Sequence, residues 1–185
     1  RYGVNYSALF HPRRSILGAW LASKPALIRI DNVIIAHGGV STDYLGATLE
    51  SFDDSLAAYV GEELFARWSD TTYAPPLDSA GFARRENFFW SPNSVFWYRE
   101  YAQSDTLTNA LAAVLGRYRA RIHVIGHTAG PTIRERYAGS LILVNTLPFG
   151  REVLLLVRKS GGSYDRWRYR TAGAPEPLEN SPSER

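Results

Sequence analysis

Apolar residues along the chain occur partly in short unbroken runs and partly at helical spacing. The segment ALIRIDNVIIAHGG predicts two short strands about a turn at residues 31–32, the second strand being almost continuous in β-branched residues. Residues 43–70 carry apolar side chains at helical spacing and predict a helix. Residues 104–120 predict another helix, because Ser104 or Asp105 can cap its start and an apolar face follows.

Between and after these helices the pattern changes again. Residues 71–95 are rich in Pro, Ser, Asn and aromatic residues and predict a long ordered loop. Further strands are predicted at RIHVIGH, SLILVNTL, REVLLLVRKS and YDRWRYR, and a short helix at RRSILGAWLASKP. Residues 171–185 are Pro-rich and polar and predict a disordered tail. Along the chain, a strand pair is followed by helices, a further strand and then several consecutive strands. This order indicates an α/β fold, a layered mixed β-sheet with flanking helices.

Composition narrows the function classes. The 185 residues are 45% hydrophobic and 21% charged, which is typical of one globular domain, and no apolar run is long enough to span a membrane. The net charge is only +3 with arginines spread along the chain, so no nucleic-acid partner is expected. There is no cysteine, so any metal must be held by His, Asp, Asn or Glu. There is also no methionine and the chain starts at Arg1, which favours a processed or truncated chain.

Two histidines stand out because each follows an apolar run and is flanked by glycine. His37 ends VIIAHGG and His127 ends HVIGH. Ligands of open α/β sheets gather at the carboxyl ends of strands, and imidazole is a common ligand of divalent metals. We therefore expect both rings to point into one metal pocket; the alternative is a pair of hydrogen-bonded structural residues. His123, inside the strand, is expected to pack in the core.

Three segments in order resemble one family. GAWLASKPALIRIDNVIIAHGGVS resembles the His-Gly-Gly region of the calcineurin-like metallophosphoesterases, VFWYREYA resembles the Trp-Tyr-Arg segment of their Shewanella-like protein phosphatase branch, and HVIGHTAGPTIRERYAGSLILVNT resembles their Gly-His-Thr motif and hairpin. The resemblance spans roughly residues 15–157. It implies that residues 1–170 are the C-terminal part of a four-layer αββα metallophosphatase sandwich, with residues 45–103 as a cap-like insertion.

The resemblance also implies chemistry: hydrolysis of phosphomonoesters by two divalent ions (Mn, Fe, Zn or Mg), most like a bacterial serine/threonine or tyrosine protein phosphatase. His37 and His127 would bind the second metal. Arg99 would contact the substrate phosphate, because a guanidinium matches two phosphate oxygens; its alternative is a surface ion pair with Glu100. The partners implied are a phosphorylated protein or a small phosphoester.

The family's Gly-Asp-x-His-Gly, Gly-Asp-x-x-Asp-Arg-Gly and Gly-Asn-His-Glu motifs are absent, and Asn145 replaces its usual Asp. We therefore expect a fragment that lacks the N-terminal half of its domain and is inactive alone. The alternatives are a hydrolase of dinucleoside polyphosphates or small phosphoesters, and a non-catalytic binding module. An aromatic cluster could be a wall over the site, although the core of a helical cap is favoured. Its members are Phe88, Phe89, Trp90, Phe96, Trp97, Tyr98 and Tyr101.

Overall fold

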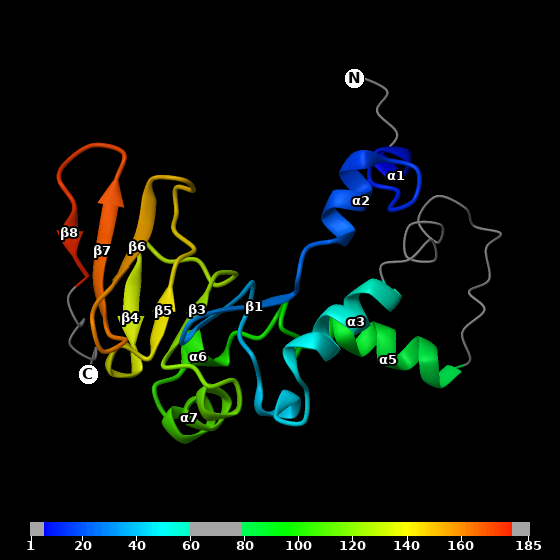
Figure 1. The fold of residues 1–185 in the computed structure, drawn as a ribbon, viewed down its shortest axis with the longest axis horizontal. Coiled ribbons are helices and arrows are strands. Elements are labelled where there is room, and N and C mark those ends of the chain that lie inside the picture. Colours follow the sequence, from blue (N-terminus) through cyan, green and yellow to red (C-terminus); the bar gives the residue numbers. More distant parts are fainter. Residues whose placement is uncertain (1–5, 60–78, 179–185) are drawn as a thin grey trace.

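The computed structural model describes residues 6–59 and 79–178, and a five-stranded sheet forms its centre. Its strands are β1 (Leu27–Ile30), β2 (Val33–Ala36), β3 (Ile122–Ile125), β4 (Arg134–Arg136) and β5 (Leu141–Leu143). Their order is β1-β2-β3-β5-β4 (Figure 1). The strands β2, β3 and β5 are parallel, whereas β1 and β4 join the two edges antiparallel. The prediction of a mixed sheet in an α/β fold is confirmed.

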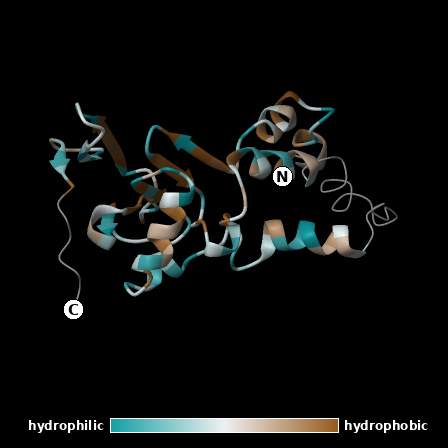
Figure 2. Ribbon diagram, turned by 60° about the horizontal axis from the view of Figure 1, so that its bottom comes forward, coloured by the Kyte–Doolittle hydropathy of each residue, from teal (hydrophilic) through white to brown (hydrophobic). Residues whose placement is uncertain are grey.

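Helices pack against one face of this sheet and beside its β1 edge (Figure 1). They are α3 (Leu49–Tyr59), α5 (Ser79–Trp90), α6 (Glu100–Gln103) and α7 (Thr108–Arg117). Alternate strand residues such as Ile34 and Ile125 pack with helix residues such as Phe52 and Leu111 in one buried cluster. Several strands are strongly hydrophobic in Figure 2, and β2 and β3 are buried along almost their whole length because they are covered on both faces.

A second, three-stranded sheet covers the other face. It consists of β6 (Glu152–Arg158), β7 (Tyr164–Arg170) and β8 (Glu176–Pro177), paired antiparallel. Leu154 and Leu156 of β6 pack against Val124 and Ile142 of the larger sheet. The described residues therefore form three layers, one of helices and two of sheet. The four-layer αββα sandwich is not confirmed.

Charged pairs join the two sheets around this apolar contact. Arg166 of β7 places its Nη1 atom 2.6 Å from Oε1 of Glu135, a β4 residue that is only 4% exposed. The same nitrogen donates to the carbonyl of Gly139 at 2.9 Å. Glu152 of β6 accepts a hydrogen bond of 2.6 Å from the backbone N–H of Ile133. A buried carboxylate is tolerated here because it is both paired and hydrogen-bonded.

Several predicted elements differ in the structure. A helix, α5, occupies residues 79–90 of the predicted loop. The predicted helix at 43–70 begins with the 3₁₀ turn η1 (Thr42–Tyr44) and continues as α3, and its residues from 60 on lie outside the described part. Leu107, not Ser104 or Asp105, is the N-cap of α7, and it caps without a side-chain hydrogen bond. β8 lies inside the predicted tail, so that part of the tail is ordered.

The remaining elements are short. The N-terminal segment forms α1 (Tyr6–Leu9) and α2 (Ile16–Ala22), a short helix that the sequence predicts and that Ser15 caps. The 3₁₀ turn η2 (Tyr137–Gly139) links β4 to β5. Within residues 6–59 and 79–178, no helix is long and apolar enough to cross a membrane.

Candidate functional site

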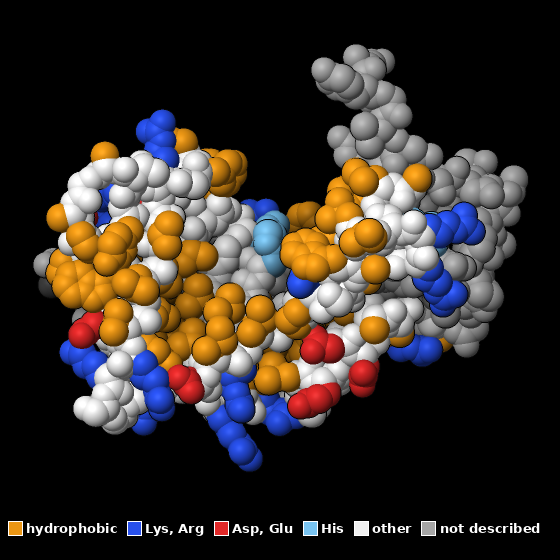
Figure 3. All heavy atoms as spheres, turned by 45° about the horizontal axis from the view of Figure 1, so that its top comes forward, with side chains coloured by type: hydrophobic (Ala, Val, Ile, Leu, Met, Phe, Trp, Pro, Cys, Tyr) orange, Lys and Arg blue, Asp and Glu red, His pale blue; other side chains and the backbone are white. Residues whose placement is uncertain are grey.

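His37 and His127 meet at the carboxyl ends of two neighbouring parallel strands. His37 directly follows β2 and His127 follows β3 by one glycine, Gly126. Nε2 of His37 lies 3.2 Å from Nδ1 of His127, and the ring centroids are 5.0 Å apart. Figure 3 shows histidine side chains at the surface, in the hollow between the sheets and the helical part of the molecule. The structure thus brings the two predicted residues together.

The backbone between the two strands fixes this meeting. Gly126 donates its N–H to the carbonyl of His37 at 2.9 Å, and a Cβ at Gly126 would lie 3.2 Å from that same oxygen. His127 itself has φ of 56°, in the left-handed region that few residues other than glycine adopt. Such strain in a non-glycine residue marks a position held by its surroundings, often at functional sites.

The two glycines after His37 hydrogen-bond to the loop that follows α5. The N–H of Gly38 donates to the carbonyl of Val95 at 2.7 Å, and that of Gly39 to the carbonyl of Tyr98 at 3.0 Å. A Cβ at Gly38 would lie 2.9 Å from the Val95 oxygen and 3.1 Å from the Trp97 nitrogen, both backbone atoms. Only glycine allows this approach, which carries Trp97 and Arg99 to the histidine pair.

The surroundings of His127 favour the uncharged form of its ring. Burial lowers the pKa of its imidazole, and the nearby charges of Arg99 and His37 lower it further. The edge of its ring meets Trp97 at 89°, with centroids 5.0 Å apart. Among the described residues its buried Nε2 atom has no hydrogen-bond partner. Because Nδ1 of His127 lies at hydrogen-bond distance from Nε2 of His37, one ring carries the shared proton, and the tautomer decides which remaining nitrogen has a lone pair.

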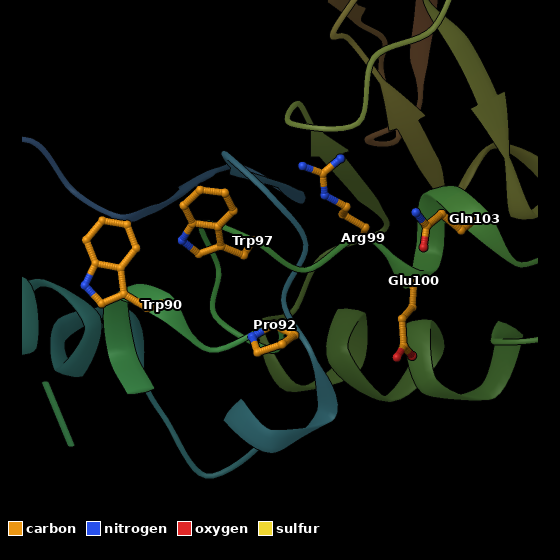
Figure 4. Close-up of a pocket in the computed structure, with 6 residues that line it drawn as sticks. All are labelled: Trp90, Pro92, Trp97, Arg99, Glu100 and Gln103. Carbon is orange, nitrogen blue, oxygen red and sulfur yellow. The ribbon is translucent and has the colours of Figure 1, made fainter. Parts of the chain in front are cut away.

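Arg99 lies on the rim of an open pocket beside this pair. The residue precedes α6 and its side chain is exposed. The pocket has a volume of about 370 Å³. Figure 4 shows its lining residues, which are Trp90, Pro92, Trp97, Arg99, Glu100 and Gln103. Arg99 therefore supplies positive charge next to the histidines, and its predicted role in binding phosphate stays a prediction.

His123 occupies the core, as expected. It is fully buried, its Nε2 accepts the N–H of Val40 at 3.1 Å, and its Nδ1 lies 3.3 Å from the carbonyl of Ile34. These partners require a neutral ring with the proton on Nδ1. Burial lowers its pKa to about 4. His123 thus joins the two strands from within and does not reach the pocket.

The fold is shared with solved structures that are described as protein-tyrosine phosphatases. The chain matches the solved structure of a cold-active protein-tyrosine phosphatase of a psychrophilic Shewanella species with a TM-score of 0.68, 24% identity and coverage of 95% of this chain. A mutant described as a cold-active protein tyrosine phosphatase matches with a TM-score of 0.70, 24% identity and 94% coverage. The chain spans about half the length of these structures, 49% and 48%. No family model and no curated protein matches.

These comparisons correct the family assignment. The resemblance to calcineurin-like metallophosphoesterases is overturned, because the matching structures are described as protein-tyrosine phosphatases and no family model matches. The implied cofactor of two divalent ions and the manganese serine/threonine phosphatase assignment are corrected with it. The described residues contain no group of three His, Cys, Asp or Glu side chains that could hold a metal ion. The separate prediction that His37 and His127 are metal ligands is untested and stays a prediction.

The sequence did not predict that the loop carrying Trp97 and Arg99 would lie beside the histidine pair. Trp97 contacts His127 directly, although the aromatic cluster was favoured as core. Three members of that cluster, Phe88, Tyr98 and Tyr101, are buried, whereas Trp90 and Trp97 are exposed. No local signal in SPNSVFWYRE, where four apolar residues follow one another, marks Trp97 as the exposed member.

Proposed function

We propose that this chain contributes half of a phosphomonoester hydrolase site, with Arg99, His37 and His127 as its functional residues. The observation that carries the proposal is the meeting of His37 and His127 at the carboxyl ends of β2 and β3, with Arg99 near enough to lower the pKa of His127. The shared fold with protein-tyrosine phosphatases supports the same reaction class. The other half of the site would come from polypeptide that corresponds to the part of those structures that the chain does not span.

Each residue has a role that its chemistry allows. The guanidinium of Arg99 can donate two hydrogen bonds to phosphate oxygens and offset their charge as the phosphorus is attacked. An imidazole of the His37–His127 pair can accept a proton from the attacking water, while the phosphorus–oxygen bond to the leaving group breaks. The uncharged form of imidazole also coordinates metal ions, so the assay must be run both with EDTA and with added divalent cations. A cysteine nucleophile is excluded in this chain, which contains no cysteine.

The test compares the native gene product with the 185-residue chain, assaying p-nitrophenyl phosphate with EDTA and with added divalent cations. We expect the native product to be active and the chain alone to be nearly inactive. Arg99→Gln and His127→Ala should each lower kcat/KM by about 100-fold or more, in line with the loss of one transition-state contact. Arg121→Gln is the matched control, because this exposed arginine lies at the opposite end of β3.

Activity that survives both site variants, or no phosphatase activity in the native product, would overturn the proposal. A panel of substrates that includes a dinucleoside polyphosphate tests the second enzymatic candidate, a hydrolase of dinucleoside polyphosphates or small phosphoesters. Tight binding of a phosphate compound without turnover would instead favour the non-catalytic binding module.

A further inference from the structure

Strand β6 forms one edge of the second sheet, and no strand of the described residues pairs with its outer side. The strand order is β6-β7-β8 (Figure 1). All seven residues of β6 pair with β7 in one unbroken antiparallel register, so the strand contains no bulge. A regular edge strand of this length presents a row of backbone N–H and C=O groups to which a further strand can pair.

The hydrogen bonds of the hairpin show which backbone groups face this open edge. Thr171 donates its N–H to the carbonyl of Arg151 at 3.1 Å, and Lys159 donates to the carbonyl of Ser163 at 2.8 Å. Hydrogen-bonded pairs alternate along an antiparallel ladder, so the odd-numbered residues of β6 bond to β7. The backbone groups that point to the open edge belong to Glu152, Leu154, Leu156 and Arg158.

Two other sheet edges carry features that discourage pairing, whereas β6 does not. β4 has the sequence Arg-Glu-Arg, and β8 has only two residues, one of them Pro177. Charge, proline and short length are common protections of an edge strand. In β6, five apolar residues follow one another from Val153 to Val157. Its outward side chains Val153, Leu155 and Val157 are 62%, 39% and 44% exposed, which suits an apolar partner.

The sequence of β6 is complementary to itself when two copies run antiparallel. If Leu155 lies opposite the Leu155 of a second copy, Val153 lies opposite the second copy's Val157. This register pairs even-numbered residues with even-numbered ones, so the open backbone groups of both strands meet as hydrogen-bonded pairs. It also keeps the exposed side chains of both copies on one face, whereas a shift by one residue would place them on opposite faces.

The charges at the ends of β6 favour the same register. Glu152 of each copy would lie opposite Arg158 of the other, whereas parallel pairing would bring like charges together. Arg158 pairs with Asp31 of its own chain at 3.2 Å, yet its side chain is still 60% exposed. Glu152 pairs with Arg170 at 3.0 Å and its side chain is only 7% exposed, so it contributes the smaller part of this preference.

We propose that β6 pairs with the β6 of a second copy of this chain, so that two three-stranded sheets join into one continuous sheet. A two-fold axis at Leu155 relates the copies and closes the interface. The exposed valines and Leu155 of both copies then form one apolar strip across the junction, bordered by Tyr169 of β7. This inference concerns a surface that the proposed phosphatase site does not use.

The test is sedimentation velocity on the native gene product. We expect a dimer with a Kd on the order of 10 µM, because the paired surface is small. Leu155→Lys and Leu155→Glu should each raise this Kd about 10-fold or more, because like charges would face each other at the axis. A mixture of the two variants should form a heterodimer, because opposite charges then face each other. This recovery would also show that both variants fold.

Tyr169→Lys is the matched control. Tyr169 is 39% exposed, as Leu155 is, and lies on the same face but one strand away from the open edge. We expect this substitution to change the Kd by less than about twofold, the range of most surface substitutions. An equal weakening of the dimer by Tyr169→Lys would indicate stacking of the outer faces and would overturn edge pairing.

Three further outcomes would contradict the proposal. A monomeric native product would mean that the edge has another occupant, for example polypeptide outside this chain. A dimer that Leu155→Lys leaves intact would form through a different surface. A mixture of the Lys and Glu variants that stays monomeric would show that position 155 does not face itself. None of these results bears on the proposed phosphatase function, whose test is hydrolysis of p-nitrophenyl phosphate.

Discussion

Two histidines of the same chain segment, His123 and His127, have opposite environments. His123 lies inside β3, fully buried and bonded to two backbone groups of neighbouring chain. His127 follows the end of the same strand, has a left-handed backbone, and leaves one nitrogen without a partner among the described residues. Within the strand, packing and backbone hydrogen bonds define what an imidazole can do. Past the strand end, the corresponding side chain instead faces a second histidine and an exposed tryptophan, in a part of the chain that loops can reshape.

The largest expected effect comes from removing His123. His123→Ala leaves a cavity and removes the acceptor of the buried Val40 N–H, so we expect a loss of about 3–5 kcal/mol in the free energy of unfolding. His127→Ala should cost less than about 1 kcal/mol, because its ring is partly exposed. Urea denaturation of the two variants measures the difference. Similar losses in both would contradict the division between a structural and a functional histidine.

A pH titration of stability sharpens the same contrast. The pKa of His123 is lowered to about 4 in the folded chain, against about 6.5 when unfolded. The unfolded chain therefore binds more protons as the pH falls, and stability is lost between these two values. From pH 7 to pH 5 we expect a fall of about 2 kcal/mol, measured by denaturation at each pH. Carboxyl groups stay mostly ionised over this range.

The control for that fall is His123→Gln, which keeps a donor and an acceptor but does not titrate. Its stability should change much less from pH 7 to pH 5 than that of the unaltered chain, whereas His127→Ala should retain most of the fall. An unchanged fall in His123→Gln would show that other groups cause it.

The strands were predictable because their signal is local, and some helices were not. The β2 and β3 segments are almost continuous apolar runs, so their buried positions follow from sequence. The buried positions of α5 have helical spacing, but two of the three are Gly81 and Arg85, which carry no apolar signal. β4 has the sequence Arg-Glu-Arg, and its central Glu135 is buried only because Arg166, distant in sequence, pairs with it.

The candidate site likewise has one part that the sequence predicted and one part that it did not. Glycine-flanked histidines after apolar runs predicted where His37 and His127 would meet, because the carboxyl ends of parallel strands coincide. Nothing local predicted that Val95 and Tyr98 would lie against Gly38 and Gly39. That contact joins segments more than fifty residues apart and depends on tertiary packing. The family assignment went further than these residues could support, and the structural comparisons corrected it.

Gly38 offers a smaller test of how the helical part is attached to the strand end. Gly38→Ala would place a Cβ 2.9 Å from the carbonyl oxygen of Val95, so the loop that carries Trp97 and Arg99 must move. We expect a loss of about 1–2 kcal/mol, the cost of inserting a methyl group into a packed contact. Phosphate binding at Arg99, followed by NMR, should weaken at the same time. Unaltered stability and binding would mean that the loop can shift without consequence.

The smallest expected effect has the opposite sign and comes from Gly116. This residue lies in α7, is exposed, and has no atom within 4 Å of the position where a Cβ would be added. Gly116→Ala should therefore raise the free energy of unfolding by about 0.5–1 kcal/mol, because alanine lowers the backbone entropy lost on helix formation. Thermal denaturation of Gly116→Ala and of Gly38→Ala compares the effect of one added methyl group on stability at an exposed helix position and at a close backbone contact. A stabilised Gly116→Ala with a destabilised Gly38→Ala would show that the glycine after His37 is required for close contact. Destabilisation of both would point to a general intolerance of the chain to substitution.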